Sequence, residues 1–105
     1  MAADQRFYTH APGLSQDAVI TLIADADEIH VLRVIHFSYR SAAAPSIGKL
    51  TVDVGGATVY EDNVVEAGPK QVLFDDGLYG NKNEALVITL LGLNNKVGRL
   101  NAIVD

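Results

Sequence analysis

One stretch of the sequence constrains the fold more than any other: residues 28–40, which read EIHVLRVIHFSYR. This apolar-rich run is dense in β-branched and aromatic side chains. Successive side chains of a strand point to opposite faces, so alternate positions fall into two sets. One set is apolar apart from a single charge: Ile29, Val31, Arg33, Ile35, Phe37 and Tyr39. The other set is mixed in polarity: His30, Leu32, Val34, His36 and Ser38.

A helix is disfavoured in this stretch because no stripe with a period of 3.6 residues separates its polar from its apolar positions. The pattern predicts a long central strand, with the apolar set facing the core and the mixed set partly in water. We expect the stem of Arg33 to lie along the apolar face, with its charged head at a sheet edge.

Further short runs with strand-like patterns lie on both sides of this central strand. They span residues 6–9, 18–24, 49–54, 57–63, 70–74, 85–91 and 97–104. Turn-rich segments separate them, at 12–13, 25–27, 40–48, 55–56, 64–69, 75–83 and 92–96. The pair Gly55–Gly56 predicts a hairpin, since primed turns need a positive φ. About eight short strands without a convincing helix predict an all-β protein, an antiparallel β-sandwich of the jelly-roll type.

The side chains that face the core follow from the same alternation. In the strand at 49–54 the inward set is Leu50, Val52 and Val54, and in the last strand one face holds Leu100, Ala102 and Val104. Val97 and Ile103 lie on the other face of the last strand. The run ALVITLL at 85–91 is nearly all apolar, which predicts a strand buried on both faces. In the strand at 57–63, either Val59 or Tyr60 is expected to face the core.

A length of 105 residues fits one β-sandwich domain, which we place at 18–105. Residues 1–17 precede it and hold two large apolar side chains, Phe7 and Tyr8, in a polar surrounding. The segment is expected either to form a first short strand at 6–9 on its own domain or to act as an arm that docks on a neighbouring subunit.

Charge and composition exclude several classes of function. The formal net charge is -5 and the eight Lys and Arg residues are scattered, so we expect no nucleic-acid partner. The chain has no cysteine, which excludes a disulfide framework and thiolate chemistry. No apolar run approaches the ~20 residues of a membrane helix, and the first residues do not resemble a signal peptide, so no membrane association is expected.

Residues that bind metals are present but poorly arranged. Asp25, Asp27 and Glu28 form an acidic turn, and clustered carboxylates can coordinate Ca²⁺. No EF-hand loop follows, so a solvated acidic turn is favoured. His30 and His36 are six positions apart on one strand, about 20 Å at ~3.3 Å per residue, too far to share a metal. We therefore expect no metal and no other cofactor.

The sequence also lacks the pattern of an enzyme. No serine lies in a G-x-S-x-G elbow, and no paired acid and base can be named. The segment at 77–80, GLYG, lacks the lysine and the following helix of a phosphate loop. It is expected to be either a turn with two core-directed side chains or an exposed contact loop formed by Leu78 and Tyr79. The chain is therefore expected not to be an enzyme.

Three segments between Thr21 and Val104 carry a family resemblance: TLIADADEIHVLRVIHFSY, GKLTVDVGGATVYEDNVVEAGPKQVLFDDGLYG and NEALVITLLG with VGRLNAIV. The shared features are a long strand ending in Ser38–Tyr39, a G-x-L-x-V hairpin closed by Gly55–Gly56, the step Gly68–Pro69 and the loop between Gly77 and Gly80. With these features the chain resembles small jelly-roll proteins of tailed bacteriophages, namely head decoration (cement) proteins and related virion modules.

The resemblance implies a virion structural protein that binds the outside of the major capsid protein lattice and stabilises it. It also implies a homotrimer whose heterologous contacts close into a ring. Its location would be the capsid exterior, after the host cytoplasm during assembly, and the acidic charge fits a site away from packaged DNA. The expected partner contacts are Arg6, Phe7 and Tyr8 in the N-terminal segment and Leu78 and Tyr79 in the loop.

An alternative is a receptor- or carbohydrate-binding module of a phage tail or fibre. Such a module needs exposed aromatic side chains as a platform for sugars. The chain has no tryptophan and four tyrosines, which supplies that platform poorly.

Overall fold

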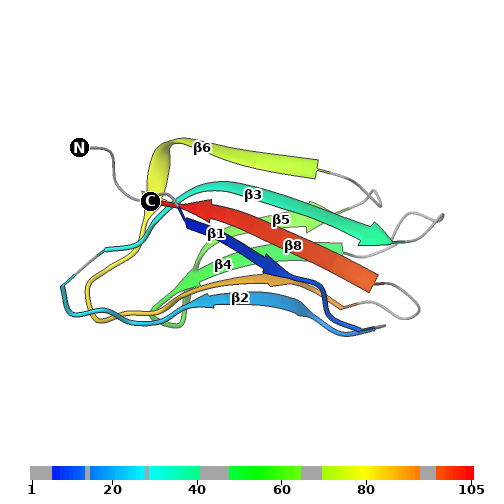
Figure 1. Cartoon of the computed structure of the whole chain (residues 1–105), viewed down its shortest axis with the longest axis horizontal. Coiled ribbons are helices and arrows are strands. Elements are labelled where there is room, and N and C mark those ends of the chain that lie inside the picture. Colours follow the sequence, from blue (N-terminus) through cyan, green and yellow to red (C-terminus); the bar gives the residue numbers. More distant parts are fainter. Residues whose placement is uncertain (1–5, 14, 28, 41–47, 65–69, 93–96) are drawn as a thin grey trace.

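The computed structural model describes residues 6–13, 15–27, 29–40, 48–64, 70–92 and 97–105. Within these residues the chain forms eight strands and no helix (Figure 1). The strands are β1 (Arg6–His10), β2 (Ala18–Leu22), β3 (Val31–Arg40), β4 (Gly48–Val54), β5 (Ala57–Val64), β6 (Lys70–Tyr79), β7 (Leu86–Leu90) and β8 (Val97–Val104).

Two four-stranded sheets pack against each other as two layers (Figure 1). Sheet A has the strand order β1-β8-β3-β6, and sheet B has the order β2-β7-β4-β5. Every paired strand is antiparallel to its neighbour. This order, in which consecutive strands repeatedly cross from one sheet to the other, is that of a jelly roll. The predicted all-β, antiparallel β-sandwich is confirmed.

The core lies between the sheets and is formed by alternate residues of both. Leu50, Val52 and Val54 of β4 are buried, as the alternation predicted. So are Leu100, Ala102 and Val104 of β8. Each strand therefore gives one face to the core and the other to the surface. The remaining buried apolar side chains are Ala18, Ile20, Leu22, Leu32, Ile35, Phe37, Tyr39, Val64, Leu86, Ile88 and Leu90.

A β-bulge at Arg33 overturns half of the predicted face of β3. Leu32 pairs with Val104 and Val34 with Ile103 on β8, so Arg33 is an extra residue without an opposite partner. The extra residue reverses the alternation, and Leu32 lies on the same side as Ile35. The expectation that the odd-numbered residues line the core is therefore correct after the bulge and wrong before it.

In the residues before the bulge, the buried and the exposed side chains are therefore the reverse of those predicted. Ile29 is exposed and Val31 half-buried, whereas His30 and Leu32, predicted for the mixed face, are buried. The head of Arg33 does reach an acidic partner: its Nε donates to Oδ2 of Asp105 at 2.5 Å. The hydrogen bond and charge of Asp105 raise the pKa of Arg33 against the opposing effect of desolvation.

The predicted turn at 75–83 is wrong over its first half, because β6 continues to Tyr79. Leu73 pairs with Val34 and Leu78 with Leu32, so residues 74–77 of β6 lie opposite Arg33 alone. Gly77 has a φ of +80°, a conformation that glycine adopts without strain. The polar and glycine residues that resemble a turn are thus part of an irregular edge strand.

The hairpin between β4 and β5 is confirmed, with φ of +59° at Gly55 and +87° at Gly56. Of the two candidates on β5, Tyr60 packs against the core and against the ring of Phe74, whose centroid lies 5.2 Å away. Val59 is exposed.

The strand β7 lies between β2 and β4, and its buried side chains alternate with half-buried ones. Val87 and Thr89 point to the outer face of sheet B and are half-buried, so burial on both faces is wrong for β7.

Several predictions concern residues outside the described part of the chain. These are the segment 1–5, Glu28 of the acidic turn, most of the loop at 40–48, the Gly68–Pro69 step and most of the turn at 92–96.

Candidate functional site

A row of apolar side chains crosses the outer face of sheet A, with one residue from each strand. Phe7 of β1 pairs with Ile103 of β8, Ile103 pairs with Val34 of β3, and Val34 pairs with Leu73 of β6. The two ends of this apolar row are the most open, with Phe7 72% and Leu73 61% exposed. Large apolar groups that remain in water across a whole sheet mark a surface suited to binding another molecule.

A second row lies two positions along the strands and is polar. Thr9 pairs with Asn101, Asn101 with His36, and His36 with Gln71, and all four are exposed. This polar row contains no carboxylate, ammonium or guanidinium group. The outer face of sheet A therefore presents an apolar and an uncharged polar row side by side.

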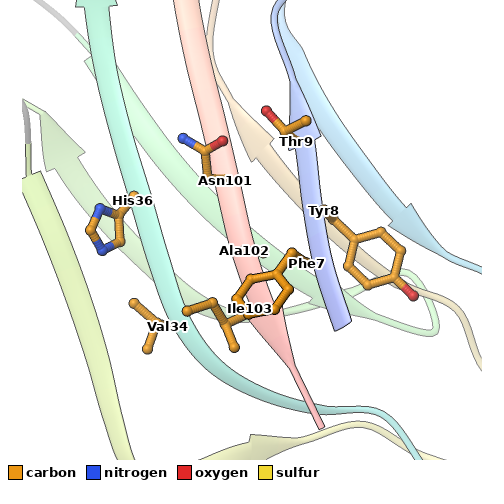
Figure 2. A pocket seen from close by; sticks show the side chains of 8 residues that line it. All are labelled: Phe7, Tyr8, Thr9, Val34, His36, Asn101, Ala102 and Ile103. Atoms are coloured by element: carbon orange, nitrogen blue, oxygen red, sulfur yellow. The ribbon is translucent and has the colours of Figure 1, made fainter. Parts of the chain in front are cut away.

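The two rows border a shallow hollow of about 300 Å³ over β1, β8 and β3. Figure 2 shows Thr9, Asn101 and His36 on one side of it and Phe7, Ile103 and Val34 on the other. The groups available here are an aromatic ring, an amide, an imidazole and a hydroxyl. They can form apolar contacts and neutral hydrogen bonds, and the hollow contains no acid to pair with the imidazole in catalysis.

The structure separates the three candidate residues of the N-terminal segment. Residues 6–10 form β1, which pairs with β8 of the same chain. Phe7 points outward into the apolar row, whereas Tyr8 points inward and packs against the core. Arg6 is half-buried at the start of the strand.

The second pair of candidates lies on the opposite edge of sheet A. Leu78 packs against the core, and Tyr79 is 62% exposed at the end of β6, opposite Val31. Phe7 and Tyr79 are therefore on the two edge strands, β1 and β6, and do not form one site.

Tyr79 adjoins an end of the sandwich that we call the loop tip, the described residues of 23–30 and 80–85 (left in Figure 1). Backbone hydrogen bonds of 2.8 Å join its two loops, from Gly80 to the carbonyl of His30 and from Asn83 to the carbonyl of Asp25. Two exposed isoleucines, Ile23 at 76% and Ile29, lie on the first loop.

His30 holds the loop tip together from inside. Its side chain is buried, and Nε2 donates to the carbonyl oxygen of Ile23 at 2.7 Å. Nδ1 is buried without a hydrogen-bond partner among the described atoms. His36, by contrast, belongs to the polar row on the outer face of sheet A, so the two histidines have unrelated environments.

No metal site is found in the part of the chain that the structure describes. Within it, no group of three or more His, Cys, Asp or Glu side chains could hold an ion. Asp25 instead accepts a hydrogen bond from the amide of Asp27 at 2.8 Å, an Asx turn of the ordinary kind.

Comparison of the chain with protein-family models, with curated proteins and with solved structures finds no match. The described residues contain no helix with the length and hydropathy needed to cross a membrane.

Sequence reasoning identified Phe7 and Tyr79 but not the rest of the two exposed apolar areas. Ile103 and Val34 lie in the apolar row because of strand pairing between distant segments, and period-two patterns do not predict which strands pair. Ile103 does carry one usable signal, because it falls on the face opposite Leu100, Ala102 and Val104.

Proposed function

We propose that this protein is a non-enzymatic head decoration (cement) protein of a tailed bacteriophage, which binds the outside of the major capsid protein lattice and stabilises the shell. The proposal is supported by the sequence resemblance between residues 21 and 104 and by the jelly-roll order of the strands. Fold alone does not specify a function, so the choice depends on the surface.

The observation that carries the proposal is the exposure of three large apolar side chains at and beside the loop tip, Ile23, Ile29 and Tyr79. Ile23, on the first loop, and Tyr79, at the end of β6 beside the loop tip, are both more than half exposed. Backbone hydrogen bonds join the two loops of the tip. Exposed apolar side chains on a preorganised backbone lose little conformational entropy when they dock on a protein surface. We assign the loop tip, which includes Ile29, and the adjoining Tyr79 to the contact with the capsid.

The test uses capsid shells that lack the protein. We expect the purified protein to co-sediment with these shells and to raise the temperature at which they release their contents. Absence of both effects would end the proposal.

The contact surface is tested with the double variant Ile23→Asp/Tyr79→Asp, which places charges on the loop tip. We expect at least about a tenfold loss of affinity, as for charges placed within an apolar contact. The matched control is Leu91→Asp, because Leu91 is 39% exposed and follows the end of β7 that is opposite to the loop tip. Equal binding by both variants would reject the loop tip as the contact.

A further inference from the structure

We infer that the outer face of sheet A is an interface between two copies of this chain, related by a two-fold axis parallel to the strands. The inference goes beyond the proposed function and uses a different surface, the apolar row and the polar row described above. It also differs from the three-fold ring that the family resemblance implies.

The apolar row is complementary to itself under this symmetry. A two-fold axis between the facing sheets, parallel to the strands and passing between β8 and β3, reverses the strand order and keeps the position along each strand. Phe7 of one copy then lies opposite Leu73 of the other, and Ile103 lies opposite Val34. In such an isologous contact the same four residues are buried on both copies.

The polar row matches itself in the same register. Asn101 of one copy lies opposite His36 of the other, and Thr9 lies opposite Gln71. An amide offers both donors and acceptors to an imidazole, and a second amide does the same for a hydroxyl. The polar groups that the contact would desolvate thus have partners, as a stable interface requires.

Charge also favours this face over others. The chain has a formal net charge of -5, so two copies repel each other over most orientations. The eight side chains of the two rows carry no formal charge with histidine neutral. On the outer face of sheet B the corresponding positions carry charges: Asp53, and Glu61 in an ion pair of 3.3 Å with Lys49. Two copies that face each other through the two rows therefore bring no charged side chains of these rows together.

The size of the face indicates a weak dimer. Four strands at ~4.8 Å spacing and five residue pairs at ~3.4 Å give a flat area of roughly 300–350 Å². A stable interface buries about 800 Å² on each partner. We therefore expect a concentration-dependent equilibrium between monomer and dimer, with sheets packed ~10 Å apart and nearly aligned.

The test is sedimentation equilibrium over a wide range of protein concentration. We expect the wild-type mass to rise from monomer to dimer. Phe7→Glu should weaken the dimer at least about tenfold, because the substitution acts twice across the two-fold axis. The control Val59→Glu places the same charge on sheet B and should leave the dimer unchanged.

A charge pair tests the register itself. In Phe7→Glu/Leu73→Lys the two new charges lie on opposite edge strands of one copy, about 14 Å apart, and cannot pair within it. In the proposed dimer the new carboxylate at position 7 of each copy lies opposite the new ammonium group at position 73 of the other copy. Dimerisation should therefore recover relative to Phe7→Glu. A wild-type protein that stays monomeric, a trimer that Phe7→Glu leaves intact, or no recovery in the double variant would overturn the inference.

These outcomes are separate from those of the proposed function. Loss of capsid binding on changing Ile23 and Tyr79 tests the loop tip, and loss of the dimer on changing Phe7 tests sheet A. Thermal unfolding of each variant at low concentration shows whether the fold is intact, which we expect because Phe7 and Leu73 are exposed.

Discussion

The hydroxyl of Tyr39 donates a hydrogen bond of 2.7 Å to the backbone carbonyl of Leu91. Tyr39 lies on β3 of sheet A, and Leu91 directly follows β7 of sheet B, so the bond joins the two layers. The ring is buried among the core residues at the same time. One side chain thus contributes both apolar contact and a polar link between the sheets.

Removing this hydroxyl should destabilise the fold. Tyr39→Phe keeps the ring and leaves the carbonyl of Leu91 without its donor, which costs about 1 kcal/mol for a buried hydrogen bond. Urea denaturation gives the difference in free energy of unfolding. Tyr79→Phe is the control, because Tyr79 is exposed and its hydroxyl should contribute little. A stability of Tyr39→Phe equal to wild type would contradict the role of the bond.

The stability should also fall at high pH. Burial raises the pKa of Tyr39 to about 12, against about 10 in an unfolded chain. Below pH ~10 the hydroxyl of Tyr39 is protonated in both the folded and the unfolded chain, so the full stability of the fold is present. As the pH rises from ~10 to ~12 the unfolded chain loses the proton first, so the free energy of unfolding decreases.

The variant Tyr39→Phe should flatten this decline. A smaller decline is expected to remain, because burial and then Asp62 raise the pKa of Tyr60 as well. Denaturation midpoints measured between pH 9 and 12 (roughly the interval set by these pKa values) test the effect. A decline of the same size in wild type and variant would refute the assignment to Tyr39.

His30 should be important for the stability of the loop tip. His30→Ala removes a buried ring and the donor to the carbonyl of Ile23, and we expect a loss of about 2 kcal/mol. Amide exchange in residues 23–30 should accelerate more than in β8. His36→Ala removes the same ring from an exposed position and should change stability by no more than about 0.5 kcal/mol. Equal effects of the two substitutions would show that His30 does not hold the tip.

Gly92 is a position where a methyl group does not fit. A Cβ there would approach backbone atoms of Ser15, Gln16 and Asp17, the nearest at 2.6 Å from the carbonyl carbon of Gln16. Gly92→Ala should therefore cost about 2 kcal/mol, as overpacking against rigid atoms does. At Gly13 the nearest atom would be the flexible end of the Gln16 side chain at 3.3 Å. Gly13→Ala should be close to neutral in thermal unfolding, and a similar loss in both variants would count against the steric explanation.

The sequence was sufficient to predict the fold class because its signals are local. Alternation in residues 49–54 and 97–104 identified the inward side chains, and Gly55–Gly56 identified the hairpin. These patterns depend on the geometry of one strand or one turn, which neighbouring residues determine.

The errors arose where a long-range contact overrides the local pattern. At Arg33 the chain accommodates an extra residue, and the ion pair with Asp105, 72 positions away, lies at this bulge. No local rule marks that position as a bulge. The sequence of β6 after Leu73 has turn-like composition, yet pairing with β3 keeps it in the sheet.

The candidate surfaces were only partly predictable for the same reason. Phe7 and Tyr79 are recognisable as aromatic residues outside the main apolar runs. The apolar row also needs the pairing of Phe7 with Ile103, which joins the first and the last described strands, β1 and β8. Such pairings follow from the topology of the whole sandwich.

The position of β8 between β1 and β3 has a consequence for biosynthesis. Of the eight described strands β8 is synthesised last, and both β1 and β3 need it to complete their hydrogen bonds in sheet A. During translation β1 therefore has no partner strand while β2 to β7 are made. Closure of the sheet becomes a late event that joins distant segments, which is the kind of step that makes all-β proteins fold slowly.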